Sequence, residues 1–157
     1  MSRFVVEIES LVRPEWIDAN GHMNLAYYVV AFDLATDALY DVLGIGQAYR
    51  DATPYSCFTV ETHTLYEREM LAGEKLRVGA HLLSRDDKRL IYFHEMFHAG
   101  TGERVAAQEL LALHIDMRIR RVAPFPEDRR VAIDTVLRAR EGAPLPKGAG
   151  RRIALPR

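Results

Sequence analysis

Residues 25–43 carry the pattern that most constrains how this chain can fold. Side chains that suit a buried helix face recur there at helical spacing, namely Leu25, Tyr28, Val29, Phe32, Ala35, Thr36, Leu39 and Leu43. Asn24 is placed to cap the start of the predicted helix, and Gly44 is placed to end it. One helix cannot bury such a face alone, so another layer of secondary structure must cover it.

The rest of the pattern predicts that this layer is an antiparallel sheet. Alternation and β-branched content predict strands at 4–13, 57–70, 75–84, 89–99 and 103–117, with short turns between the last four. Helix propensity competes in the last segment, but a meander of turn-spaced strands needs a further partner strand there. We therefore predict an α+β fold with an antiparallel sheet wrapped around one long central helix.

The remaining segments are expected to be a loop at 45–56, a short helix near 127–140 and a loose tail at the end. The length of 157 residues fits one domain, with a core at about 4–120 and an extension at 121–157. These segments are short, and the longer pattern of strands and one helix therefore determines the fold class.

Composition narrows the classes of protein that this chain can belong to. The net charge of −1 gives no general attraction for nucleic acid, and no apolar run is long enough to span a membrane. The single cysteine, Cys57, excludes an internal disulfide, and the first ten residues lack a signal-peptide pattern. We expect a cytoplasmic protein that binds neither nucleic acid nor membrane. From Arg118 onward eleven basic residues face four acids, which indicates either a solvated tail or a local attraction for an anionic ligand.

The segment from Trp16 to Asn24 gathers an acid, two carboxamides and an imidazole just before the predicted helix. A helix N-terminus offers unpaired N–H groups and a partial positive charge. Together these groups meet the needs of acyl transfer, which are a base or nucleophile and an oxyanion site. Asp18 can attack a carbonyl carbon or act as a base on water; the alternative is that it only caps the following turn.

The other residues of this segment also have two interpretations each. His22 can polarise a carbonyl group, orient water or contact the leaving group, and Asn20 can hold water or substrate through its amide. A structural histidine and an ordinary turn asparagine are the alternatives. Gly21 either lets the backbone approach a substrate closely or is a simple turn glycine. Asn24 is expected to be an N-cap in preference to a direct substrate contact.

One segment of the sequence resembles a metal-binding motif. Residues His94 to His98 read H-E-x-x-H, which binds zinc only on a helix, where the two imidazoles share a face. Here the motif lies in an aromatic-rich segment between turns, which predicts a strand. The two imidazoles would then be about 13 Å apart, so no metal site is predicted.

The order of elements and the motif Asp18-x-Asn20-x-His22-x-Asn24 resemble the hotdog-fold thioesterases of the 4-hydroxybenzoyl-CoA thioesterase type, over about residues 4–120. The motif spacing also resembles the plant acyl-ACP thioesterases, in which the matching Asp18, Asn20 and His22 are assigned to catalysis. Residues 16–37 and 87–89 are similar to thioesterase domains associated with carnitine breakdown, to which hydrolysis of betainyl-CoA is assigned.

This resemblance implies an acyl-CoA substrate and no cofactor, since coenzyme A is part of the substrate. It implies a homodimer or a dimer of dimers, with sheets joined edge to edge and active sites at the subunit interface. Asp33 lies near the family's helical acid. Hydrolysis of a small or medium acyl-CoA is therefore the leading hypothesis. The alternatives are a non-catalytic acyl-CoA-binding hotdog module and a hotdog enoyl-CoA hydratase.

Further candidates lie outside the motif. Glu61 with His63, and Tyr92 with His94, alternate along predicted strands and either line an acyl pocket or make cross-strand contacts. Glu109 is either buried and functional or at the surface. Five aromatic residues either belong to the core or form a cation–π box for a trimethylammonium group; they are Trp16, Tyr27, Tyr28, Phe58 and Tyr66. Lys88 and Arg89 lie at a predicted hairpin, where their side chains either bind coenzyme A phosphates or are solvated. The candidate substrate-binding residues are Gly21, Asn24, Tyr27, Asp33, Glu61, Lys88 and Arg89.

Overall fold

The computed structural model describes residues 3–155 of the chain. Its strands are β1 (Val6–Leu11), β2 (Tyr55–Tyr66), β3 (Lys75–Arg85), β4 (Arg89–His98), β5 (Arg104–Asp116) and β6 (Arg121–Val122). Its helices are the 3-10 turn η1 (Pro14–Trp16) and the α-helices α1 (Leu25–Val42), α2 (Gln47–Ala52) and α3 (Glu127–Arg138). The predicted order of strand, long helix and antiparallel strands is confirmed, and residues 104–116 are a strand despite their helix propensity.

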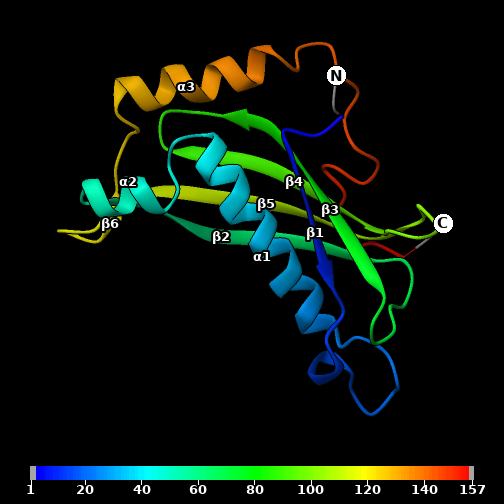
Figure 1. The fold of residues 1–157 in the computed structure, drawn as a ribbon. Coiled ribbons are helices and arrows are strands. Elements are labelled where there is room, and N and C mark those ends of the chain that lie inside the picture. The colour runs from blue at the N-terminus through cyan, green and yellow to red at the C-terminus, as the bar shows by residue number, and fades with distance from the viewer. Residues whose placement is uncertain (1–2, 156–157) are drawn as a thin grey trace.

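The strands form one antiparallel sheet that curls around α1 (Figure 1). Their order across the sheet is β1-β3-β4-β5-β2, and β6 pairs with the end of β5. The short turns that separate β3, β4 and β5 in the sequence make these strands neighbours. β1 instead crosses to pair with β3, with Val6 opposite Ala80, and so occupies one edge of the sheet. β2 occupies the other edge.

One side of α1 forms the centre of the core. On that side, the α1 residues Phe32, Ala35 and Leu39 are fully buried where the helix packs on β1, β3 and β4. Leu25 and Val29 were expected on the buried face, and that prediction is wrong: they are 62% and 40% exposed. Leu25 is the first helical residue and lies at the mouth of a pocket, while Val29 lies at the margin of the buried face.

The predicted loop at 45–56 contains one short helix that its sequence does not reveal. α2 has six residues, no side-chain cap and no buried residue, so neither periodicity nor capping marks it. Its Tyr49 hydroxyl lies 2.9 Å from Nε2 of the buried His114 on β5. This contact fixes α2 over the end of the sheet.

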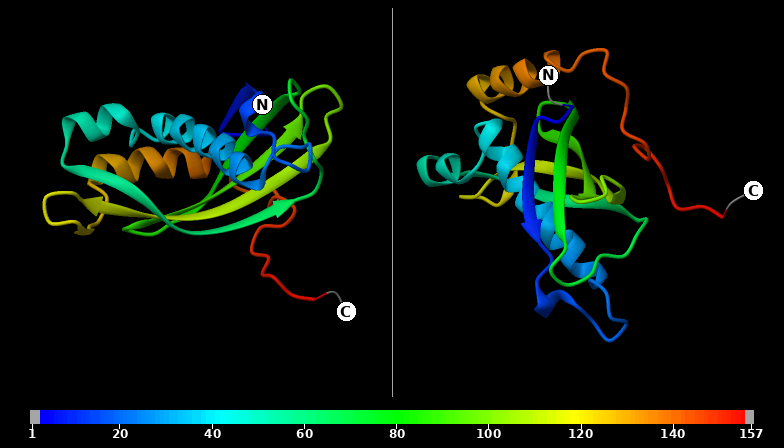
Figure 2. Two further views of the ribbon diagram at one scale, coloured as in Figure 1. Left: turned by 90° about the horizontal axis from the view of Figure 1, so that it is seen from below. Right: turned by 45° about the vertical axis from the view of Figure 1, so that its right-hand side comes forward.

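The C-terminal segment lies on two sides of the sheet. α3 buries Ile133 beside Leu82 and Phe125, within a cluster that also contains residues of α1. Beyond α3 the chain turns to the outer face of the sheet, opposite α1 (Figure 2). There the carbonyl of Lys147 accepts a hydrogen bond from Arg104, and residues near the end are exposed, as expected of a loose tail. Within residues 3–155, no helix has the length and hydropathy that crossing a membrane requires.

Candidate functional site

The loop before α1 is closed by its own backbone. Ile17 and Met23 form an isolated antiparallel bridge, and the Asp18 N–H donates to the His22 carbonyl at 3.2 Å. The turn between them places Gly21 at φ +81°, a left-handed conformation that glycine adopts without strain. Met23 is fully buried and donates its N–H to the Met70 carbonyl, which ties the loop to the segment between β2 and β3. The side chains on this loop are therefore held by a fixed backbone.

Asp18 is a half-buried carboxylate with both oxygens engaged. Oδ2 accepts a hydrogen bond from the Asn24 side-chain amide at 3.0 Å, and Oδ1 accepts one from the Asn20 backbone N–H at 2.8 Å. These two bonds, and to a smaller extent the nearby His22, hold the pKa of Asp18 below its usual value. Asp18 is thus an oriented anion at neutral pH. It also caps the turn that follows it, which was the structural interpretation of this residue.

Asn24 connects this carboxylate to the helix. Its Oδ1 accepts the Ala26 N–H at 3.0 Å, which confirms the predicted N-cap, while its Nδ2 donates to Asp18. Among the described residues, the N–H of Leu25 donates to no protein acceptor. One backbone donor at the positive end of α1 is therefore left open beside the loop.

A pocket of about 290 Å³ adjoins this open donor, and His22, Leu25, Tyr28 and Tyr66 are among its lining residues. The His22 Nδ1 lies 3.2 Å from the Met23 carbonyl, so Nδ1 carries the proton that it donates there. In the neutral ring the Nε2 atom is then the acceptor. Tyr28 and Tyr66 meet edge to face, with ring centroids 5.3 Å apart and planes at 90°.

The structure brings Asp18, His22 and Asn24 together, and the Asn20 backbone joins them. The Asn20 side-chain amide is exposed and bonds to no other described residue. Tyr27 instead stacks on the buried Trp16, with ring centroids 5.5 Å apart.

Other candidates lie away from the loop. Lys88 and Arg89 follow the far end of β3, roughly 30 Å along that strand from the loop. Arg89 is paired there with Asp86. Asp33 and Glu61 are exposed on α1 and β2, and neither lines the pocket beside His22.

The aromatic and histidine candidates divide between core and surface. Trp16 and Tyr28 are buried, as predicted, but Phe58 and Tyr66 are 36% and 46% exposed, so the core prediction is wrong for them. The segment 94–98 is a strand, as predicted. His94 contacts Thr36 at 2.9 Å and Tyr92 contacts Tyr40 at 3.1 Å, so both pack against α1 and not across strands.

Some pocket residues carry no signal in the sequence. Glu69 lines the pocket from the loop after β2, next to Arg68, whose carbonyl accepts a hydrogen bond from the Tyr28 hydroxyl at 2.9 Å. This contact joins residues 40 positions apart. Only the tertiary structure brings them together.

Comparisons with known proteins agree on one family. The model of the thioesterase-like superfamily matches residues 12–137. The betainyl-CoA thioesterase of Pseudomonas aeruginosa is 36% identical over 156 residues, which are 99% of this chain and 98% of that protein. The L-carnitine dehydrogenase/betainyl-CoA thioesterase of Agrobacterium fabrum is 40% identical over 145 residues, which are 92% of this chain and 29% of that larger protein.

Solved structures show the same fold. A putative thioesterase from Pseudomonas putida KT2440 aligns over 100% of both chains, with a TM-score of 0.84 and 33% identity. A Staphylococcus aureus protein solved in complex with CoA aligns over 96% of this chain and 94% of its own, with a TM-score of 0.86 and 28% identity. The hotdog fold predicted from the sequence is confirmed.

Proposed function

We propose that this chain, which belongs to the thioesterase-like superfamily and is an acyl-CoA thioester hydrolase, takes betainyl-CoA as its substrate. The observation that carries the proposal is the arrangement at the start of α1. The anchored Asp18 carboxylate lies on the loop beside a pocket that is lined by His22, by Leu25 with its open backbone N–H, and by an aromatic corner. The 36% identity to a betainyl-CoA thioesterase along nearly the whole chain supports the same substrate.

In the proposed mechanism, Asp18 acts as a base toward water or as a nucleophile toward the thioester carbonyl carbon. As a base, it takes a proton from water while the water oxygen bonds to that carbon. The carbonyl oxygen becomes an oxyanion, which the Leu25 N–H and the helix N-terminus stabilise. The carbonyl then re-forms, the C–S bond breaks, and the CoA thiolate takes the proton from Asp18. As a nucleophile, Asp18 forms a mixed anhydride that water hydrolyses to the same products.

His22 and Asn20 have supporting roles in this proposal. His22 lines the pocket, and its free Nε2 can accept a hydrogen bond from the attacking water or from the departing thiol. The exposed amide of Asn20 can hold the same water. Because a thiolate leaves readily, this chemistry assigns no step to a metal ion.

The acyl group is proposed to enter the pocket beside His22. The perpendicular rings of Tyr28 and Tyr66 form a corner of this pocket, and two acids, Glu67 and Glu69, line it together with Arg68. A trimethylammonium group is attracted to aromatic faces and to a nearby negative charge. A betainyl group carries this cation two bonds from the thioester carbonyl carbon, so the pocket suits it.

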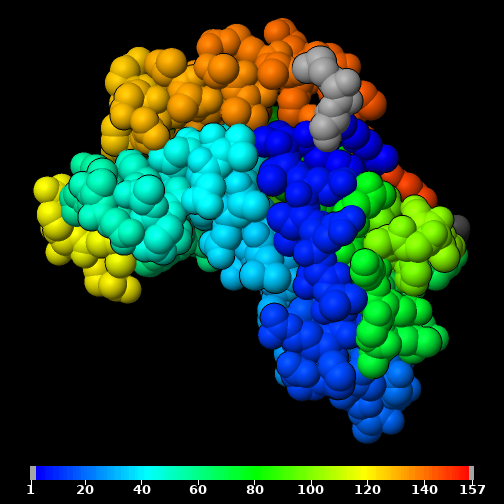
Figure 3. Space-filling model, in the orientation of Figure 1, coloured from blue at the N-terminus to red at the C-terminus, as the bar shows by residue number. Residues whose placement is uncertain are grey.

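We also propose that the protein is a homodimer, in which the partner chain contributes further groups near the loop that precedes α1. β2 has 12 residues and pairs with β5 on one side, which leaves its outer edge open. The near side of α1 is uncovered (Figure 3) and exposes Val29, Val30 and Leu34. A second chain paired along β2 would cover these side chains. Asp33 and Glu61, both exposed on α1 and β2, would then border the interface.

The first experiment is free-thiol release from a panel of acyl-CoAs, with the wild-type chain and with Asp18→Ala. The panel contains acetyl-, betainyl-, 3,3-dimethylbutanoyl-, medium straight-chain and aromatic acyl-CoAs, and a 2-enoyl-CoA. We expect rapid release from betainyl-CoA that depends on Asp18. Bound substrate without thiol release would favour the binding module. Loss of the enoyl double bond without thiol release would favour the hydratase.

A further inference from the structure

A chain of hydrogen-bonded polar and charged side chains crosses the outer face of the sheet, away from α1. Glu95 on β4 is 1% exposed and accepts hydrogen bonds from Arg3 at 2.6 Å, His81 at 2.9 Å and Arg104 at 3.1 Å. Arg104 also pairs with Glu67 at 2.6 Å. Neighbouring side chains from five segments thus hold one another in fixed positions.

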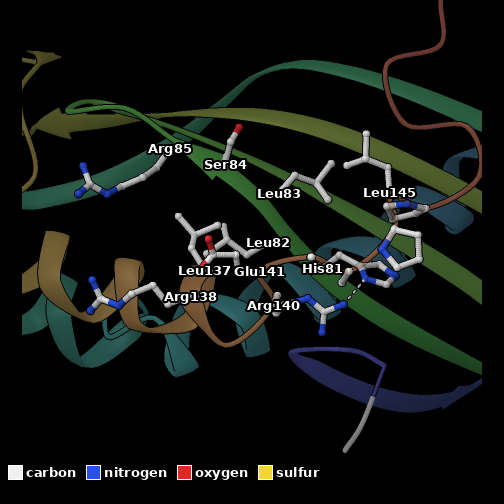
Figure 4. Close-up of a pocket in the computed structure, with 14 residues that line it drawn as sticks. His81, Leu82, Leu83, Ser84, Arg85, Leu137, Arg138, Arg140, Glu141 and Leu145 are labelled. Atoms are coloured by element: carbon white, nitrogen blue, oxygen red, sulfur yellow. Dashed lines mark hydrogen bonds between the residues drawn. The ribbon is translucent and has the colours of Figure 1, made fainter.

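Arg140, just beyond α3, ends this chain of contacts. Its Nη2 lies 3.1 Å from His81 Nδ1 (Figure 4). A guanidinium group only donates, so His81 Nδ1 accepts, and His81 Nε2 carries the proton donated to Glu95. His81 is therefore a neutral ring that fixes the orientation of Arg140.

Arg140 itself has no carboxylate partner among residues 3–155. Burial, and secondly the charge of Arg3, lower the pKa of Arg140, as expected for a cation without a neighbouring anion. A guanidinium has five N–H donors, and within residues 3–155 Arg140 makes only the bond to His81. Its remaining donors are available to a ligand.

Two adjoining hollows of about 510 and 660 Å³ share Arg140 and His81, and the segment that follows α3 walls both. Arg3 and Lys147 line the larger hollow with Arg140, and Glu141 is the single acid in that described lining. Cations thus outnumber anions in this lining, and of the three cations Arg3 is already paired with Glu95. The space exceeds what a lone phosphate group needs and falls in the range of small-molecule sites.

We propose that this hollow binds a phosphate-bearing small molecule, with Arg140 as the principal ligand and with Arg3 and Lys147 beside it. A guanidinium matches two oxygens of a phosphate in a planar, bidentate contact, and His81 holds it ready for that contact. The site lies on the opposite face of the sheet from α1 and shares no lining residue with the pocket beside His22. The basic C-terminal segment thereby gains a function independent of the proposed thioesterase reaction.

Calorimetric titration at low ionic strength tests the proposal without any acyl substrate. The probes are inorganic phosphate, ADP and, as a control without phosphate, adenosine. The variants are Arg140→Gln and Arg121→Gln, which remove the same charge; Arg121 is exposed on β6 and lines neither hollow. We expect saturable binding of phosphate or ADP that weakens at least about tenfold in Arg140→Gln and changes little in Arg121→Gln. Tighter binding of ADP than of phosphate would identify a nucleotide, and equal binding would identify free phosphate.

Three results would overturn the proposal. They are an absence of saturable binding, equal binding of adenosine and ADP, and equal losses in the two variants. If Arg140→Gln does not fold, Arg140→Lys keeps the charge and removes the planar fork, and it must still weaken binding relative to Arg121→Lys. Because thiol release is not measured here, failure of this site and failure of the proposed betainyl-CoA hydrolysis are separate outcomes.

Discussion

Asp18 shows how one residue can satisfy both a structural and a chemical requirement. Its carboxylate closes the turn through Asn20 and receives the amide of Asn24, and these same bonds lower its pKa. The carboxylate therefore stays ionised to a lower pH than a free aspartic acid does. If Asp18 is the base or nucleophile, activity should persist in mildly acidic solution.

The variant Asn24→Asp tests this link between hydrogen bonding and activity. It keeps the oxygen that caps Ala26, but it replaces the amide donor with a carboxylate that repels Asp18. The pKa of Asp18 should rise, so kcat/KM should begin to fall at a higher pH as the solution is acidified. Asn20→Asp adds the same charge without removing a side-chain donor to Asp18, and it should move the acidic limb less. Identical profiles for both variants and the wild type would remove Asp18 from the reaction.

Tyr66 provides the matched test of the proposed cation–π corner. Its ring meets Tyr28 at 90° on the pocket wall. Replacing it by leucine removes the π face while keeping an apolar side chain, so KM for betainyl-CoA should rise about three- to thirtyfold. KM for 3,3-dimethylbutanoyl-CoA, which has the same shape without the charge, should change much less. Equal changes for both substrates would show that Tyr66 contributes shape alone.

His94 gives a prediction about acid stability. Thr36 faces its Nε2, while its Nδ1 is buried without a partner among the described residues. Burial lowers the pKa of His94 to about 3. The unfolded chain binds the proton at about 6.5, so this contribution to stability is complete above that pH and is lost as the pH falls toward 3.

The size of this effect is on the order of a few kcal/mol. His94→Gln should lose less unfolding free energy than the wild type between pH 6.5 and 4, as measured by urea denaturation. His63→Gln, which removes a half-buried imidazole from β2 by the same substitution, serves as the matched control. A wild-type slope in His94→Gln would contradict the assignment.

At the scale of elements, the contribution of the buried side of α3 to stability can be measured separately from that of its exposed side. Ile133 is fully buried, whereas Val131 on the same helix is 52% exposed. Ile133→Ala should lower the free energy of unfolding by about 2–4 kcal/mol, and Val131→Ala by less than about 1 kcal/mol. Urea denaturation of the two variants measures the difference. Equal losses would mean that α3 contributes little packing to the core.

The elements also show what the sequence could and could not predict. The long strands and α1 have strong periodicity over many residues, so they were predicted to within a few residues at each end. α2 has no apolar period and no side-chain cap, so it could not be predicted. In the site, Asp18, His22 and Asn24 are close in sequence and were found together. The wall formed by Tyr66 and Glu69 depends on long-range packing, which no local pattern encodes.

At the scale of the whole molecule, the open edge of the sheet is the main unpartnered feature. α1 packs mainly on β1, β3 and β4, and it leaves part of its surface exposed. Val30 and Leu34 on α1 are each 44% exposed, and Val60 on β2 is 53% exposed. A long edge strand with an unpaired side is a ready template for pairing with another strand. The simplest partner is β2 of a second copy, related by a two-fold axis.

This arrangement predicts a solution mass of at least twice the 17.9 kDa of one chain, measured by sedimentation equilibrium. Val60→Lys places a charge on the edge and should shift the equilibrium toward monomer. Val131→Lys introduces the same change at an equally exposed position on α3 and should leave the mass unaltered. A wild-type chain that sediments as a monomer at micromolar concentration would contradict the dimer. If thiol release is lost together with dimerisation in Val60→Lys, groups from both chains complete the site; if release persists in the monomer, one chain's loop and α1 N-terminus suffice for the chemistry.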